Sequence, residues 1–553
     1  MWLINVTTKT LENFIGSSVP PYVILSHTWE DQEVSFQDMG AEARSSMKGY
    51  QKILKTCELA AGEGIDYAWV DTCCIDKSSS AELSEAINSM FRWYRDAKIC
   101  HVYLSDMPSS RRAGTSLHDD LKSCRWFTRG WTLQELIAPR AVTFWDQDWN
   151  FVGRKAELCA DIHSITGVPT ALLRHQHGGY LSDYSIAARM SWAAKRQTTR
   201  SEDIAYCLLG IFDINMALLY GEGRKAFYRL QEEIIKSSDD GSIFAWTDSS
   251  LWAPTCTSVL ASRPILFERC GSIRVLDHTL KGMSMTSSGV HAKASLATGP
   301  SPSGPQTYIL PMGAISGPSS SGIFLRKVGP STYLRYLPSK LAWVDEPVRR
   351  RRVEPIYLIS KLPTDRPGLL PNPTPAAWGA STLKVILPNT EMGESTLELG
   401  MTYPDSNWDA HDQLFFAANE ACRGWAVFGV FGEIKVFDVH ITLDLLCACV
   451  GWSSMEDEPI RSTIVTRGTT LTHRSSWAID HAYLQTLSFE EDFAVEGYMS
   501  GEMGFHQWAT VETVLWDGSK GQANIALRFV EEPGRESCTG RAILVELQIT
   551  LQD

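Results

Sequence analysis

Two short apolar runs near the start of the chain are each followed by side chains that could bind a nucleotide. His27 could contact a ribose or a phosphate, and Trp29 could stack on a base. Asp71 and Asp76 could each accept a hydrogen bond from a ribose hydroxyl. Each residue also has a structural alternative: a hydrogen-bonded histidine, a core indole ring, or aspartates that bond nearby backbone amides in turns. The sequence leaves both interpretations open.

A third cluster, around a short helical pattern, contains Arg129, Trp131 and Glu135. Arg129 could pair with a ligand phosphate near the start of the helix, or with a local carboxylate. Thr132, followed three residues later by Glu135, fits a capping box in which the glutamate bonds the N-cap amide. A cap and a chemical role are therefore both open for this glutamate.

Cys73 and Cys74 follow the second apolar run and suggest a thiolate hydrolase with His27 as its base. Cysteine is also among the most buried residues, so an apolar filler at a strand end is the simpler interpretation. Adjacent cysteines do not easily share one tetrahedral ion, and no C-x-x-C with a matching second half exists, so we expect no metal site.

Gly221 and Gly223 open a G-x-G-x-x-A pattern that ends at Ala226, before a predicted helix. A dinucleotide fingerprint needs a preceding strand and an acidic residue about 20 positions further on, within one βαβ unit. That context is missing, and we interpret the glycines as a helix entry.

The elements that must position these residues alternate between short apolar runs and helical periodicity, which is typical of an α/β fold with a largely parallel sheet. The predicted strands occupy residues 22–25, 67–70, 99–104 and 141–145. Ligands of open α/β sheets bind beyond the carboxyl ends of the strands, where Ser26, Asp71 and the segment leading to Glu135 should converge.

The pattern changes along the chain and predicts three parts. Residues 1–150 form the α/β domain, 151–246 are mainly helical, and 247–553 form a mostly antiparallel, β-rich domain with Gly/Ser/Pro-rich loops near 284–305 and 363–388. The strand predictions of the last part rest on alternating runs at residues 425–431, 434–441, 525–530 and 545–551.

The chain has 553 residues and a formal charge of -13, with 51 basic and 64 acidic side chains. No overall positive field exists to attract phosphate backbones, so nucleic acid is not an expected partner. The sequence has no apolar window of the length of a membrane helix and no signal-peptide pattern, which predicts a cytoplasmic protein with reduced cysteines.

Residues 25–29, 69–76 and 129–135 together resemble, in order, the three sequence blocks of the fungal HET (heterokaryon incompatibility) domain family. Further segments resemble the helical extension of many such proteins, at residues 191–193, 219–223 and 242–246. Family members act in non-self recognition and programmed death of fused fungal cells, and the resemblance implies that role here.

Residues 25–31, 80–96 and 131–136 also resemble the first strand and loop, the second helix and the catalytic helix of TIR domains. Several TIR domains cleave the nicotinamide glycosidic bond of NAD with a glutamate of that helix, which by position is Glu135. A carboxylate beside the sugar can stabilise the oxocarbenium charge of that reaction. The resemblance thus implies NAD as a substrate rather than a cofactor, self-association through the N-terminal domain, and a set of nucleotide-binding residues: Ser26, His27, Trp29, Asp71, Asp76, Arg129 and Trp131.

Two other functions fit the same sequence. The N-terminal domain could be a non-enzymatic signalling module that works by homotypic contacts. The β-rich domain could bind an unknown trigger, either a ligand or a protein, and restrain the N-terminal domain.

Overall fold

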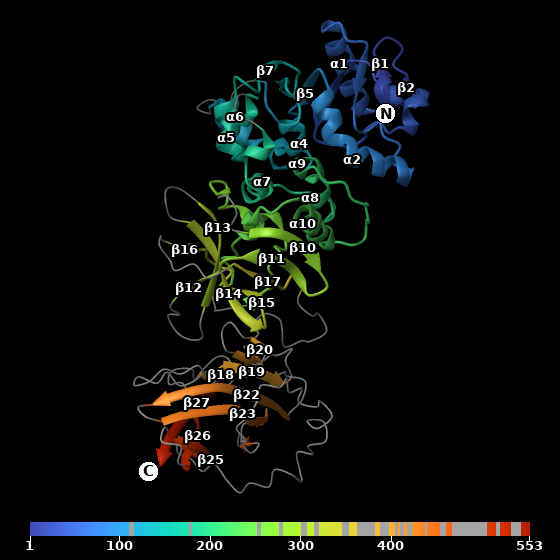
Figure 1. Cartoon of the computed structure of the whole chain (residues 1–553). Coiled ribbons are helices and arrows are strands. Elements are labelled where there is room, and N and C mark those ends of the chain that lie inside the picture. The colour runs from blue at the N-terminus through green and yellow to red at the C-terminus, as the bar shows by residue number, and fades with distance from the viewer. Residues whose placement is uncertain are drawn as a thin grey trace. The chain divides into compact units, whose positions relative to one another are not determined.

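A computed structural model of the chain describes residues 1–361, apart from 110–115, 176–179, 252–255, 276–279, 300–306, 315–319 and 345–352, and beyond 361 only strands (Figure 1). The chain divides into two compact units. The first comprises Met1–Ala297, Ile309–Phe324 and Arg335–Lys361, and the second comprises Thr298–Tyr308, Leu325–Leu334 and Leu362–Asp553. The limits at 150 and 246 that the sequence predicts both lie inside the first unit, and these domain boundaries stay predictions.

The N-terminal region is built on a seven-stranded sheet of order β2-β1-β4-β3-β5-β6-β7. Its strands are β1 Trp2–Asn5, β2 Leu11–Asn13, β3 Tyr22–His27, β4 Tyr67–Trp69, β5 Ile99–Tyr103, β6 Val142–Trp145 and β7 Phe151–Arg154. The central β4, β3, β5 and β6 are parallel, and the remaining strands are antiparallel edges. The parallel strands follow the order second, first, third, fourth, which doubly wound sheets use. The predicted mixed α/β region is confirmed, while its likeness to TIR domains stays a prediction.

The four predicted strands are those whose residues are buried on both faces. Val23, Ile24 and Leu25 of β3 have essentially no exposed surface, and continuous apolar runs of this kind are typical of parallel strands covered by helices. The β1–β2 hairpin was not predicted. Its strands have four and three residues, and its turn depends on Asn5, whose side chain accepts from the amides of Thr7 and Thr8.

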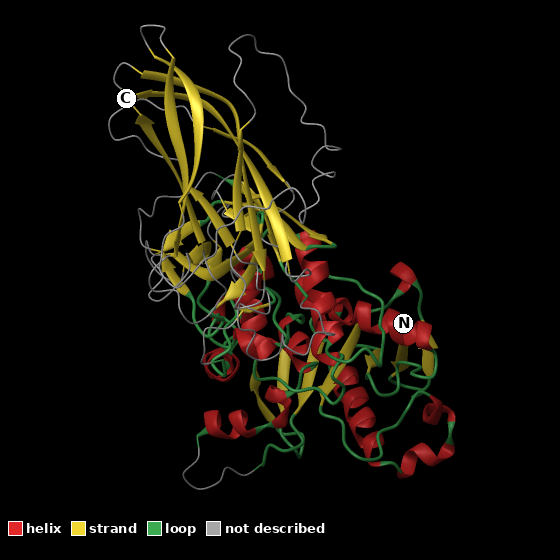
Figure 2. Ribbon diagram, turned by 90° about the horizontal axis from the view of Figure 1, so that it is seen from below, coloured by secondary structure: helices red, strands yellow, loops and turns green. Residues whose placement is uncertain are grey.

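Two long helices connect the parallel strands. α1, Lys48–Gly62, packs on β3 and β4 and buries Ile53, Cys57 and Ala60. α2, Ser80–Asp96, is capped by Ser79, whose side chain accepts a hydrogen bond from the amide of Glu82. Shorter helices surround these elements and continue beyond β7 (Figure 2). They are α3 Leu117–Ser123, α4 Thr132–Ile137, α5 Cys159–Thr166, α6 Thr170–Leu173, α7 Ile186–Ala193, α8 Asp203–Tyr206, α9 Leu209–Phe212 and α10 Lys225–Ser237.

A second sheet begins after the helical part, in the order β10-β11-β17-β15-β14-β13-β12, with β8, β9 and β16 paired to its members. Its strands are β8 Cys256–Thr257, β9 Arg274–Val275, β10 Leu280–Thr286, β11 Gly289–Ala294, β12 Ala297–Gly299, β13 Thr307–Ala314, β14 Ser320–Gly329, β15 Thr332–Tyr336, β16 Ala342–Val344 and β17 Glu354–Leu358. The loop predicted near 284–305 is wrong over 289–294, because Val290, Ala292 and Ala294 alternate inward and are fully buried. Small side chains concealed this period of two.

The helical part is bonded to residues beyond 246. Gln231 is fully buried and exchanges two hydrogen bonds with the backbone of Ala261, at 2.8 and 2.9 Å. Trp246 Nε1 donates to the carbonyl of Val259 at 2.8 Å. The guanidinium of Arg335 lies over the Trp246 ring, 4.1 Å from its centroid, and donates to the Trp246 carbonyl. Removal of these later residues would leave buried polar groups without partners.

A third sheet has the order β19-β22-β23-β25-β26-β27-β18-β21-β20, with β24 paired to β23. Its strands are β18 Thr382–Ile386, β19 Glu398–Tyr403, β20 Trp408–Asp409, β21 Leu414–Phe416, β22 Arg423–Val436, β23 Val439–Ser453, β24 Arg461–Thr466, β25 His506–Leu515, β26 Lys520–Glu531 and β27 Ile543–Gln552. The alternating runs that the sequence predicts as strands fall in β22, β23, β26 and β27, so the β-rich character is confirmed. The loop predicted near 363–388 lies outside the described residues, except for 382–386, which form β18.

In the described part of the chain, no helix is long and apolar enough to cross a membrane.

Candidate active site

Polar residues meet at the carboxyl ends of the parallel strands, beside β3. This strand lies between β4 and β5, at the point where the strand order reverses, which is the usual ligand position in doubly wound sheets. Successive strand residues point to opposite faces. Ser26 therefore faces α4, and His27 faces the side of the sheet that α1 covers.

On the first face, Ser26 and Glu135 form a buried pair. Ser26 Oγ donates to Glu135 Oε2 at 2.5 Å, and Trp126 Nε1 donates to Ser26 Oγ at 2.7 Å. A hydrogen bond from Tyr94 of α2 also favours the ionised Glu135, and the Glu135 residue is only 6% exposed. Three elements besides α4 thus fix the orientation of one carboxyl group.

Burial, together with the negative charge of Asp71, raises the pKa of Glu135 to about 8. The hydrogen bonds of Ser26 and Tyr94 and the positive charge of Arg129 lower this pKa but do not restore its usual value. At neutral pH the carboxyl group is therefore mostly protonated.

The capping box that Thr132 and Glu135 suggested is wrong. The helix begins at Thr132 itself, and the residue before it, Trp131, makes no side-chain cap bond. Thr132 Oγ1 lies 2.5 Å from the carbonyl oxygen of Trp126 and 2.9 Å from that of Arg129. The Glu135 carboxyl group is directed to Ser26 instead, so its position needs an explanation other than a cap.

On the second face, Asp71 connects His27 and Trp29. Trp29 Nε1 donates to Asp71 Oδ2 at 2.8 Å, and His27 Nε2 lies 3.5 Å from Asp71 Oδ1. Trp29 is 47% exposed, so it is not a core ring, and Lys77 Nζ lies 3.8 Å from its ring centroid. Its outer surface is available for stacking.

His27 is buried and neutral. Burial, together with the nearby ammonium of Lys52, lowers its pKa to about 3. Neither ring nitrogen has a hydrogen-bond partner among the described residues, so the alternative of a hydrogen-bonded structural histidine finds no support. Lys52 itself is held by Glu33 and Glu30, at 2.5 and 3.1 Å.

The other predicted nucleotide-binding residues have local partners. Asp76 accepts from the amide and hydroxyl of Ser78, which is the turn-forming alternative. Arg129 is half-buried, with Nη1 3.5 Å from Thr199 Oγ1. Trp131 bonds the carboxylate of Asp203. The structure thus brings Ser26, His27, Trp29, Asp71 and Glu135 to one end of the sheet, and the predicted ligand contacts stay predictions.

Sequence reasoning missed three contributors to this site: Trp126, Tyr94 and Lys52. Tyr94 and Lys52 lie on the buried faces of their helices, and Trp126 lies in a 3-10 turn, Arg125–Thr128. Only their contacts reveal them, because each partner is distant in sequence.

The thiols of Cys73 and Cys74 are buried. Burial raises the pKa of the Cys73 thiol well above its usual range, which opposes the formation of a thiolate nucleophile. In the part of the chain that the structure describes, no three His, Cys, Asp or Glu side chains gather as metal ligands do.

Gly221 and Gly223 form a turn whose backbone amides bind an anion, and that anion is the carboxylate of Glu202. Both have positive φ, +104° and +61°, and both amides donate to Glu202 Oε1, at 2.8 and 3.0 Å. α10 then begins at Lys225. The glycines thus serve as a helix entry, as their sequence context suggested.

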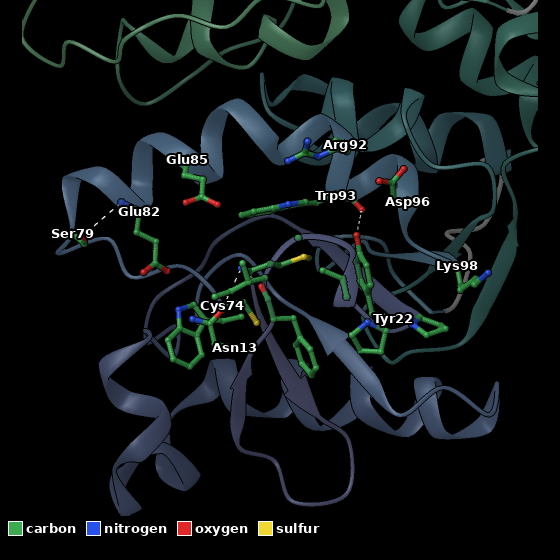
Figure 3. A pocket seen from close by; sticks show the side chains of 18 of the residues that line it. Asn13, Tyr22, Cys74, Ser79, Glu82, Glu85, Arg92, Trp93, Asp96 and Lys98 are labelled. Carbon is green, nitrogen blue, oxygen red and sulfur yellow. Dashed lines mark hydrogen bonds between the residues drawn. The ribbon is translucent and has the colours of Figure 1, made fainter.

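A groove of about 990 Å³ runs along α2, on the side facing Asn13 and Tyr22 (Figure 3). Glu82, Glu85 and Asp96 line it together with cationic side chains. None of the predicted nucleotide-binding residues lies in its wall. This groove and the buried carboxyl group of Glu135 are therefore separate features.

Residues 22–116 match the family model described as Heterokaryon incompatibility protein (HET). This part of the chain is thus similar to the HET domain. The matched residues contain β3, α1, β4, α2 and β5, whereas α4 and Glu135 lie beyond them.

A curated relative adds to this result. The chain is 50% identical over 234 residues to Vegetative incompatibility protein HET-E-1 of Podospora anserina. The match covers 41% of this chain and 17% of the relative, so the chain spans less than a fifth of that protein in the aligned part. No solved structure matches the chain.

Proposed function

We propose that this chain acts in heterokaryon incompatibility as a cell-death effector, and that it cleaves the nicotinamide glycosidic bond of NAD or a related nucleotide. The observation that carries the second part is the buried carboxyl group of Glu135, bonded to Ser26 at the carboxyl end of the sheet. The first part rests on the HET domain and on the relative named for vegetative incompatibility.

In the proposed reaction, the bond between ribose C1′ and the pyridinium nitrogen breaks, and its electron pair neutralises the departing ring. The ribose cation takes up water at C1′ and releases one proton to solvent. Glu135 stabilises this cation as a carboxylate. The positive nicotinamide ring favours that ionised form, because an opposite charge lowers the pKa of a carboxyl group.

The remaining residues have roles in binding. Asp71 is placed to accept ribose hydroxyls, and the exposed ring of Trp29 is placed to stack on a base. His27, neutral and without a hydrogen-bond partner in the described structure, can donate or accept one bond.

The full chain incubated with NAD at rising protein concentration tests the proposal, with nicotinamide measured by chromatography. We expect activity to rise more than proportionally with concentration, because we also propose self-association through the N-terminal domain. Glu135→Gln should lower the rate of NAD cleavage at least about 100-fold, and the control Glu202→Gln should retain the wild-type rate. Wild-type protein that releases no nicotinamide at any concentration would remove the enzymatic proposal.

The burial of Glu135 behind Ser26 and Trp126 favours a second candidate, a non-enzymatic signalling module. Under this alternative, Glu135→Gln still kills cells when expressed in the fungal cytoplasm, where we place the protein. Residues 247–553 then bind the trigger, a ligand or a protein, and the same killing assay with a chain altered in that region tests it.

A further inference from the structure

The start of α4 is held by a segment of the helical part, residues 196–198. Gln197 donates its amide to the carbonyl of Thr128 at 2.7 Å, and its carbonyl accepts from the amide of Gly130 at 2.8 Å. Gly130 permits this approach, since a Cβ there would lie 2.5 Å from Thr198 Cγ2. The backbone before α4 is thus paired with a segment about 70 residues later in the chain.

Arg196 extends this contact to the buried carboxyl group. Its Nη1 donates to Thr132 Oγ1 at 2.8 Å, and Thr132 lies within hydrogen-bond distance of the Trp126 carbonyl. Trp126 donates to Ser26, which donates to Glu135. The bond from Thr132 uses the backbone carbonyl of Trp126 and the bond to Ser26 uses its indole Nε1, so Trp126 is the residue that links the guanidinium to the Ser26–Glu135 pair.

The positive charge of Arg196 also acts on the Glu135 carboxyl group, in addition to these hydrogen bonds. The residue is buried, its Nη2 has no hydrogen-bond partner in the described part of the chain, and it attracts the negative charge of Glu135. Other titratable groups also interact with Glu135. They are Asp71, Tyr94, Cys100, Arg129 and Cys207.

We propose that Arg196 is a positioning residue for Glu135, so that the helical part completes the active site. This inference rests on the proposed cleavage of NAD. It implies that residues 22–116, the part matching the family model, lack both the carboxyl group and the cation that holds its helix.

Three full-length variants test the proposal: Arg196→Met, Arg196→Lys and the control Arg189→Met. Arg189 belongs to the same helical part and donates to the carbonyl of Ile211 at 3.1 Å, away from α4. Arg196→Met should lower kcat with little change in KM, and should move the pH midpoint of activity upward by about one unit. Arg196→Lys should keep the midpoint, because it keeps the charge, and Arg189→Met should change neither quantity.

A second measurement does not depend on catalysis. Each variant is compared with a double variant that also carries Glu135→Gln, and the difference between their thermal midpoints is measured at several pH values. This difference reports the ionisation of Glu135. In Arg196→Met this pH dependence should move upward, as the activity does. Equal behaviour of Arg196→Met and Arg189→Met would overturn the proposal. If the wild type does not cleave NAD, the cleavage function fails, and this measurement still decides whether Arg196 acts on Glu135. Arg196→Gln replaces Arg196→Met if the latter does not fold.

Discussion

Replacement of Glu135 by glutamine should remove a specific pH dependence of stability. The folded protein holds the Glu135 proton with a pKa of about 8, against an ordinary value of 4.5. Between these values the folded state binds more protons than the unfolded state, so stability is highest below pH 4.5 and falls as the pH rises towards 8. Each pH unit in this window costs about 1.4 kcal/mol, or roughly 3 kcal/mol between pH 5 and 7.

Glutamine does not titrate and keeps the shape and hydrogen-bonding capacity of a protonated carboxyl group. The thermal midpoint of the variant minus that of wild type should therefore increase by roughly 5 °C between pH 5 and pH 7. This figure follows from a change of about 2 °C per kcal/mol for a large unit. Differential scanning of both full-length chains at each pH measures this difference, in which the titration of all other groups cancels.

The control for this experiment is Glu202→Gln. The amides of Gly221 and Gly223 bond Glu202 and lower its pKa, so this carboxylate stays ionised in both states above pH 6. Its variant should differ from wild type by a constant amount between pH 6 and 8. The reasoning about Glu135 is refuted if the Glu135→Gln difference is equally constant.

Three further outcomes are expected. Asp71→Asn removes the negative charge that helps raise the pKa of Glu135, so the rise of NAD cleavage with pH should shift to lower pH; an unchanged midpoint in the rate profile would contradict the coupling. Trp29→Ala should raise KM by roughly 5- to 160-fold, from about 1–3 kcal/mol of base stacking, with kcat nearly constant and the KM of Trp29→Phe in between; a loss confined to kcat would exclude a stacking role. A chain ending after Trp246 should give much less soluble protein than one ending after Lys361, because Gln231 and Trp246 lose partners at a cost of about 1–3 kcal/mol for each buried group; equal yields and equal thermal midpoints would show that these bonds are dispensable.

The parallel core could be predicted because each central strand is an unbroken apolar run, as Val23 to Leu25 of β3 shows. The β1–β2 hairpin could not, since its strands are short and half-exposed and depend on the turn chemistry of one asparagine. The sequence of strand β11 resembles that of a loop, because alanines alternate with polar residues there. Local composition thus identified strands with long runs of large apolar side chains, and missed strands that are very short, such as β1 with Leu3 and Ile4, or that bury small side chains.

The candidate site was predicted in part for the same physical reason. Ser26 and Asp71 follow strands, and strand ends of a parallel sheet converge. The environment of Glu135 was not predictable, because Ser26 lies 109 residues before it and Trp126 lies 100 residues after Ser26. Nothing local to Thr132 marks Arg196 as its partner, and that contact exists only in the folded chain.

The bonds of Arg335 to the end of the helical part have a consequence for synthesis on the ribosome. This side chain reaches back 91 residues to the carbonyl of Phe244, and β17 pairs with β11 only once residues 354–358 have emerged. At about 5–20 residues per second, the nascent chain needs roughly 6 to 23 s from Trp246 to Lys361. During that time Trp246 lacks the guanidinium of Arg335, whereas Val259, which accepts the indole hydrogen bond, is already present, so the cover over this ring is completed in two steps.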